Sequence, residues 1–308
     1  MIAPMPDDRS QVFAPGLLHG RVALVTGGGT GLGRATAIEL ARCGASVVIA
    51  GRRAEVLAEA VAEIGAAPGE DRVDWVAGDV REPAGARRLV EAVLERHGRL
   101  DVLVNNAGGQ YFTPAEGIVA KGWRAVWRLN VEGMLNMAES AVQLGMGAEV
   151  EHRAGAAAGC EDMDAGSRGG AIVNVTLSPH HGMPGMAHSG AARATVEALT
   201  RELAARWVDR GIAVTAVAAG HFDTEAMAKY PDTVRAGMAR SVPLQRLGRP
   251  AEHAWLVALL CSPVGRALSG STVTLDGARD NWFGPWPPPG LTGETGEVPT
   301  EARRGVGP

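Results

Sequence analysis

The residues with the clearest chemical meaning form a glycine-rich segment between Thr26 and Gly33. The segment follows a short apolar run and precedes a stretch with helical periodicity, which predicts a turn between a strand and a helix. Glycines in such a turn let the backbone approach a pyrophosphate, whose charge is stabilised by free N–H groups at the helix start. The segment therefore predicts a dinucleotide site with the candidate contacts Thr26, Gly27, Thr30, Gly31, Leu32 and Gly33.

Two arginines, Arg52 and Arg53, follow the second apolar run. No carboxylate stands there to hold the 2′-hydroxyl of an adenosine ribose, whereas an arginine at this point accommodates a 2′-phosphate. Arg52 therefore favours NADP(H) over NAD(H) as the cofactor. The alternative is that both arginines are solvated charges at the start of a helix.

These residues need a scaffold, and the pattern of apolar runs predicts one. Short runs rich in valine and isoleucine alternate with segments of helical period, as in βαβ units around a parallel sheet. The runs are almost wholly apolar, which fits a sheet covered on both faces. We predict an α/β fold, a single doubly wound parallel-sheet (Rossmann) domain. The expected strands are Arg21–Thr26, Ser46–Ala50, Arg72–Ala77, Val102–Asn105, Ala171–Thr176, Ile212–Ala218 and Thr272–Leu275. The expected helices are Leu32–Cys43, Ala54–Ile64, Ala84–His97, Lys121–Met146, Ser189–Asp209 and Ala251–Cys261.

The chain divides into three parts on this pattern. We expect an N-terminal arm at 1–19, a Rossmann-fold catalytic domain at 20–280 and a C-terminal tail at 281–308. A glycine- and alanine-rich stretch at 147–169 is predicted to be a surface insertion in the domain.

Composition excludes several function classes. The formal net charge of −4 leaves no basic excess for binding nucleic acid. The longest uncharged stretch, which contains Ala171–Ala192, is interrupted by prolines and polar residues, so no membrane span is expected. The N-terminus shows no signal peptide. The cysteines Cys43, Cys160 and Cys261 have no metal-ligand spacing. They predict reduced thiols in a cytoplasmic protein, without a metal site.

Four motifs resemble the short-chain dehydrogenase/reductase superfamily over roughly residues 17–277. They are Thr26–Gly33, Gly78-Asp79-Val80, Asn105-Asn106-Ala107-Gly108 and Asn130. The resemblance implies that Asp79 and Val80 lie at the adenine and that Asn106, Ala107 and Gly108 floor the cofactor site. It implies a water or main-chain link at Asn130, and nicotinamide contacts from Gly220 and Thr224. It also implies a homo-oligomer, a dimer or homotetramer, paired through the helices Lys121–Met146 and Ser189–Asp209.

The expected active site departs from the pattern of that superfamily. Most members carry a serine near the end of the fifth strand and then Tyr-x-x-x-Lys, but here Ser189 and Arg193 stand at the tyrosine and lysine positions. Thr176 and Ser178 are hydroxyls near the serine position. A serine is too weak an acid to protonate an alkoxide, whereas an enolate oxygen needs hydrogen-bond donors. The missing tyrosine therefore favours reduction of an activated C=C bond, or loss of activity.

A closer resemblance supports the first of these. The segments Asn105–Gln110 and His188–Ala194 look like the peroxisomal trans-2-enoyl-CoA reductases, with the 2,4-dienoyl-CoA reductases as further relatives. This implies an NADP-dependent enzyme that reduces the C=C bond of an enoyl thioester or related conjugated carbonyl. Ser189, Thr176 or Ser178 would hold the carbonyl oxygen, and Arg193 would fix the ribose.

Two alternatives remain open. One is an alcohol or ketone dehydrogenase that uses Tyr111 or a histidine as its acid; His180, His181 and His188 are expected on the loop that faces the nicotinamide. Of these residues, Tyr111, His181 and His188 are the candidate substrate contacts. The other alternative is a cofactor-binding protein without catalysis.

Overall fold

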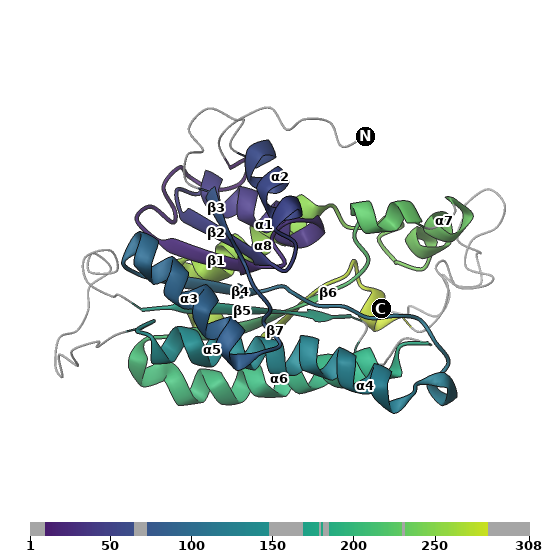
Figure 1. Cartoon of the computed structure of the whole chain (residues 1–308). Helices are drawn as coiled ribbons and strands as arrows, with labels where there is room; N and C mark the ends of the chain where they lie inside the picture. Colours follow the sequence, from purple (N-terminus) through teal and green to yellow (C-terminus); the bar gives the residue numbers. More distant parts are fainter. Residues whose placement is uncertain are drawn as a thin grey trace, which may run out of the picture.

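A seven-stranded parallel sheet forms the centre of the protein, with strand order β3-β2-β1-β4-β5-β6-β7 (Figure 1). The computed structural model describes residues 10–64, 73–147, 169–178, 180, 185–229 and 232–282. The strands are β1 (Val22–Thr26), β2 (Ser46–Gly51), β3 (Val73–Ala77), β4 (Val102–Asn105), β5 (Ala171–Leu177), β6 (Ala213–Ala219) and β7 (Thr272–Leu275). Each lies within one residue of the predicted strand at both ends, which confirms the predicted α/β fold.

Helices cover both faces of the sheet, as Figure 1 shows. One face carries α1 (Gly31–Arg42), α2 (Ala54–Ile64) and α8 (Pro250–Cys261). The other carries α3 (Pro83–His97), α4 (Ala120–Trp127), α5 (Gly133–Gln143) and α6 (Ala187–Trp207).

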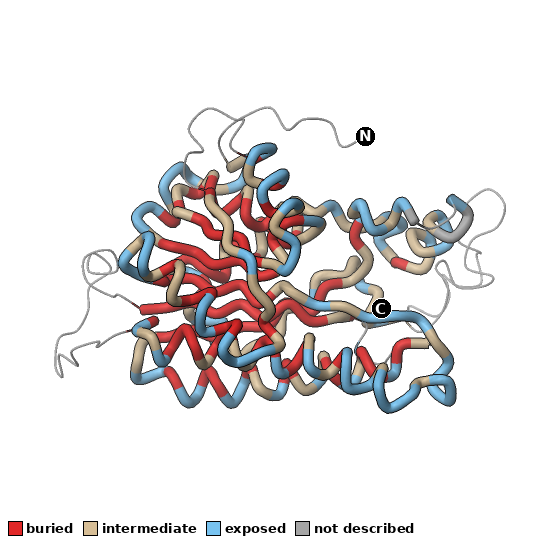
Figure 2. The backbone as a smooth tube through the Cα atoms, in the orientation of Figure 1, coloured by how far each residue is buried: buried red, intermediate tan, exposed pale blue. Residues whose placement is uncertain are grey.

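Two apolar cores, one on each face, explain why the strands are apolar throughout. Neighbouring β1 residues divide between them, since Val25 packs under α1 and Leu24 packs under α3. The five central strands are accordingly buried along nearly all of their length, whereas the edge strands β3 and β7 are mostly half-buried (Figure 2).

The predicted helix Lys121–Met146 is in fact two helices. A π-helical turn, Arg128–Glu132, separates α4 from α5. Within this turn the Asn130 side-chain amide donates to the carbonyl oxygens of Val126 and Gly109, at 2.8 Å each. A π turn adds one residue without changing the apolar pattern much, so periodicity did not predict it.

A further helix, α7 (Asp232–Arg240), was not predicted. It is short, and each of its side chains that the structure describes is half-buried or exposed, so no buried apolar stripe marks it. Much of the predicted arm (1–9), insertion (148–168) and tail (283–308) lies outside the described residues. Among the described helices, none is long and apolar enough to cross a membrane.

Candidate functional site

A cavity of about 810 Å³ lies where the carboxyl ends of the strands meet the loops that follow them. The strand order reverses between β1 and β4, and ligands of open parallel sheets bind at such a switch point. Most of the predicted site residues line this cavity: Gly27, Thr30, Gly31, Leu32, Arg52, Asp79, Val80, Asn106, Ala107, Gly108, Tyr111, Thr176, Arg193, Gly220 and Thr224.

Six predicted residues stand behind the cavity wall. Thr26, Gly33, Asn130, Ser178, His188 and Ser189 are not among its lining residues. His181 lies outside the described residues.

The glycine-rich turn has a shape that only glycine adopts without strain. Gly27 and Gly31 have φ angles of +66° and +54°, in the left-handed region. A Cβ atom at Gly33 would collide with the carbonyl oxygen of Gly27. Thr26 is buried beneath the turn, where its hydroxyl oxygen accepts the backbone N–H groups of Asn106 and Ala107 at 3.1 and 3.0 Å. The turn is therefore a cradle of backbone N–H groups, which fits a pyrophosphate.

Glu225 contacts this cradle and was missed by sequence reasoning. Its Oε2 accepts a hydrogen bond from the backbone N–H of Gly31 at 3.1 Å, and its Oε1 forms an ion pair with Arg34 on α1. The two residues are almost two hundred positions apart in the sequence, so no local pattern links Glu225 to the turn.

The part of the cavity next to the end of β2 carries positive charge. Arg52 and Arg53 are exposed residues on its wall. Asp79 accepts hydrogen bonds from Arg81 Nε at 2.9 and 3.0 Å. These bonds hold the pKa of the Asp79 carboxyl group below its usual range, so it is ionised at neutral pH.

Arg193 occupies the inner wall between β4 and β5. Its Nη1 donates to the carbonyl oxygen of Val175 at 2.7 Å, and burial lowers the pKa of the guanidinium to about 10. Its Nε is buried without a partner among the described residues. Gly108 packs against this group, because a Cβ atom there would collide with Arg193 Nη2 and lie 2.9 Å from Asn130 Oδ1. Arg193 thus presents a positive charge with unused donor capacity to the cavity.

Ser189 does not face the cavity. It is fully buried in the first turn of α6, and its hydroxyl donates to Gln110 Oε1 at 3.1 Å. Gln110 itself lines the cavity. Met186, rather than Ser189, occupies the N-cap position of α6. Ser189 therefore supports Gln110 in this arrangement and does not cap the helix.

His188 and Tyr111 pack against each other. Their ring centroids are 4.5 Å apart in an edge-to-face arrangement. His188 is buried, neither ring nitrogen has a partner in the described part of the chain, and burial lowers the pKa of the imidazole. The Tyr111 hydroxyl lies at Gly122 of α4, where a Cβ atom would overlap it. The phenol is thus directed towards α4.

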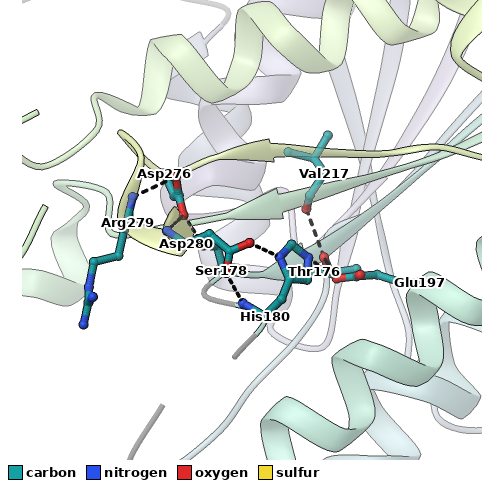
Figure 3. A network of polar contacts seen from close by, with 8 residues as sticks. All are labelled: Thr176, Ser178, His180, Glu197, Val217, Asp276, Arg279 and Asp280. Carbon is teal, nitrogen blue, oxygen red and sulfur yellow. Dashed lines mark hydrogen bonds and ion pairs between the residues drawn. The ribbon is translucent and has the colours of Figure 1, made fainter. Parts of the chain in front are cut away.

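A polar network lies beside the end of β5 (Figure 3). The Thr176 hydroxyl donates to Glu197 Oε1 at 2.9 Å, and His180 Nε2 lies 3.0 Å from the same oxygen. His180 Nδ1 lies 2.5 Å from Asp280 Oδ2.

Ser178 belongs to the same network but to another branch. Its hydroxyl donates to Asp276 Oδ2. Sequence reasoning missed Glu197, Asp276 and Asp280. Of these only Glu197 had a local signal, because it follows Arg193 by one helical turn and shares its face of α6.

The cavity lining also includes large apolar side chains, which are Phe112, Met186, Phe222, Met227 and Met238. In the described chain, no three His, Cys, Asp or Glu side chains are grouped so as to hold a metal ion.

The chain is similar to known reductases over most of its length. Residues 27–278 match the family model described as enoyl-(acyl carrier protein) reductase. A peroxisomal 2,4-dienoyl-CoA reductase of Arabidopsis thaliana is 34% identical over 269 residues, which are 86% of each chain.

Two solved structures of Pseudomonas aeruginosa proteins are also similar. The citronellol catabolism dehydrogenase AtuB is 37% identical with a TM-score of 0.72, covering 89% of this chain and all of that one. The RhlG/NADP active-site complex is 30% identical with a TM-score of 0.74, covering 87% of this chain and all of that one.

Proposed function

The chain belongs to the short-chain dehydrogenase/reductase family of oxidoreductases, and we propose that it uses NADPH to reduce the C=C bond of an enoyl thioester or related conjugated carbonyl. The observation that carries the proposal is the side chain at the tyrosine position. At that position Ser189 is buried and hydrogen-bonded to Gln110. The hydroxyl of the nearby Tyr111 points to α4. Neither Ser189 nor Tyr111 then places a phenolic hydroxyl where it could protonate an alkoxide. An enolate oxygen requires only hydrogen-bond donors and positive potential.

The cavity fits a nicotinamide cofactor, which supplies a hydride when bound. The turn from Gly27 to Leu32 would hold the pyrophosphate, and Arg52 would pair with a 2′-phosphate. Asp79 and Val80 would lie at the adenine, with Asn106, Ala107 and Gly108 beneath the cofactor. Arg193 would bind the nicotinamide ribose, and Gly220 and Thr224 would meet the carboxamide.

Thr176 is the hydroxyl best placed for the carbonyl oxygen of the substrate. All three hydroxyls are buried and donate to neighbouring side chains, but only Thr176 lines the cavity, on the same wall as Arg193. Arg193 adds positive potential that stabilises developing negative charge on that oxygen. Apolar lining residues such as Phe112, Met186 and Met238 suit the hydrocarbon part of an acyl chain.

The test is cofactor oxidation by the purified protein. NADPH and NADH are each supplied with trans-2-enoyl-CoA esters of increasing chain length, with a 2,4-dienoyl-CoA, and with 3-oxoacyl and simple ketones. We expect oxidation of NADPH with the enoyl or dienoyl esters and a saturated or partly saturated thioester as product. Turnover of ketones alone would overturn the proposal. A homo-oligomer and a cytoplasmic location remain predictions from the sequence.

A further inference from the structure

A chain of hydrogen bonds connects solvent with the cavity wall beside β5 (Figure 3). The exposed fraction of the side chain falls from 34% at His180 to 12% at Glu197, and Thr176 is 3% exposed. The two links measure 3.0 Å and 2.9 Å, and both end on Oε1 of Glu197. The chain is therefore continuous and leads inward from a half-exposed imidazole to a hydroxyl on the cavity wall.

The imidazole of His180 lies between two carboxylates. Glu197 approaches Nε2 from α6, and Asp280 approaches Nδ1 from the turn Arg279–Asn281. A carboxylate only accepts hydrogen bonds when ionised, so both contacts are satisfied at once only if each ring nitrogen carries a proton. The geometry therefore favours the imidazolium form.

Other charged groups near His180 do not oppose this. Asp276 is connected to His180 through Asp280. It accepts hydrogen bonds from the backbone N–H groups of Arg279 and Asp280 at 3.1 and 2.7 Å. The Arg279 side chain points away from His180 in Figure 3 and donates to the carbonyl oxygen of Trp282. Burial alone would lower the pKa of His180, but Asp280 and Glu197 outweigh it and raise the pKa above its usual value.

The proposed reaction needs such a group. Hydride addition to the β carbon of a conjugated carbonyl leaves negative charge on its oxygen, and a proton must then be supplied. Thr176 cannot be the final source of this proton, because its hydroxyl has only one proton and must regain it after each reaction. Its hydrogen-bond partner is Glu197.

We propose that His180 and Glu197 form a proton relay that delivers solvent protons through the Thr176 hydroxyl to the substrate oxygen. One bond forms as another breaks at each link. Nε2 of the His180 cation gives its proton to the Glu197 carboxylate, which becomes a neutral carboxyl group. The Thr176 hydroxyl turns from Glu197 to the substrate oxygen, gives its proton to that oxygen and takes the proton of the Glu197 carboxyl group in its place. His180 then regains a proton from water. The resulting enol becomes the saturated thioester by gaining a proton at its α carbon and losing the one on oxygen.

The relay rests on the proposed function, since it serves the oxygen of a conjugated carbonyl. Its test is the pH dependence of kcat for His180→Gln and Glu197→Gln, with the enoyl ester that the unmodified protein reduces fastest. Glutamine at 180 keeps a hydrogen bond to Glu197 but has no titratable proton. We expect kcat to fall about 10²-fold in both variants, as for loss of general acid catalysis. The Kd for NADPH should stay unchanged in both variants. The fall of kcat at alkaline pH, which we expect for the unmodified protein, should be absent from their pH profiles.

Two further variants serve as controls. Glu202→Gln makes the same change at an exposed site on α6 and should keep full activity. Asp280→Asn removes a carboxylate that stabilises the His180 cation but is not on the path. In Asp280→Asn the alkaline fall of kcat should begin at lower pH, while kcat at low pH stays unchanged. A merely structural contact would not give this shift.

The outcomes separate the relay from the proposed function. Equal kcat and equal pH profiles for Glu197→Gln and the unmodified protein would overturn the relay and leave the function standing. Absence of turnover of any enoyl or dienoyl ester by the unmodified protein would overturn both. Loss of kcat in His180→Gln together with an unmoved alkaline fall of kcat in Asp280→Asn would also overturn the relay.

Discussion

The carboxylate of Glu225 accepts a hydrogen bond from the backbone N–H of Gly31 at 3.1 Å. The same N–H group belongs to the cradle that we assign to the pyrophosphate. A carboxylate and a phosphate are both anions that accept from this donor, so they compete for it. Glu225 lies next to Thr224 and Ala226, which line the cavity, and its displacement would therefore move the cavity wall.

Glu225→Gln should tighten the binding of NADPH. Amide oxygen is a weaker competitor than carboxylate, and the lost ion pair with Arg34 is half-exposed, so we expect a gain of about 1 kcal/mol, or roughly fivefold in Kd. Fluorescence titration measures it. Glu63→Gln is the matched control, because Glu63 pairs with Arg34 without contacting Gly31. Weaker binding in Glu225→Gln would contradict the competition.

Arg52→Asp should reverse the choice of cofactor. A charge-assisted contact with a 2′-phosphate is worth roughly 1.5–3 kcal/mol, so the Kd for NADPH should rise about 10–100-fold while that for NADH changes little. Arg88→Asp, on the exposed face of α3, controls for net charge. Equal affinity of the unmodified protein for both cofactors would refute the assignment.

Thr176→Val should lower kcat far more than Ser189→Ala. Removing an oxyanion donor from the cavity wall typically costs 10²–10³ in kcat, and Thr176→Ser should retain most of the activity. Ser189 acts on the cavity only through Gln110, by a neutral hydrogen bond of about 0.5–1.5 kcal/mol, so its loss should cost no more than about tenfold. Steady-state measurements of kcat for the two variants test this order. A larger loss in Ser189→Ala would show that Ser189, rather than Thr176, is the important hydroxyl.

The stability of the protein should fall as pH drops below the usual pKa of histidine. His253 is fully buried, and burial lowers the pKa of its imidazole to about 4. The unfolded chain then binds a proton that the folded one does not, so up to about 3 kcal/mol is lost as pH falls from about 6.5 towards 4. Thermal melts across this range measure the loss, which should be smaller in His253→Leu. Parallel curves for the two proteins would exclude His253 as the cause.

The protein should assemble into dimers or tetramers. Trp123 on α4 is 40% exposed, which fits a helix face that is covered by a second copy. Light scattering at micromolar concentration should give a mass of two or four chains of 31.9 kDa. A mass of one chain would reject the prediction.

Prediction from sequence succeeded where neighbouring residues determine the structure. Strands such as Val22–Thr26 are apolar on both faces because both are covered, and this pattern is local. The positive φ angles of Gly27 and Gly31 follow from a turn whose composition is visible in the sequence. The contacts of Glu225 with Gly31 and of Asp280 with His180 join segments about two hundred and one hundred residues apart. Tertiary packing creates them, so no pattern in the chain indicated either one.

The π turn Arg128–Glu132 behaves as a one-residue insertion in an otherwise regular helix. A π turn winds about one more residue into a single turn than the 3.6 residues of an α turn. Deleting one residue here and winding the turn regularly would therefore leave α5 with nearly the same face towards the core, with Met137 and Ala141 still buried. The extra residue instead changes the backbone around Asn130, whose amide holds the carbonyl oxygens of Gly109 and Val126. The π turn thus lets the chain place Asn130 beside the cavity loop without moving α5 from the core.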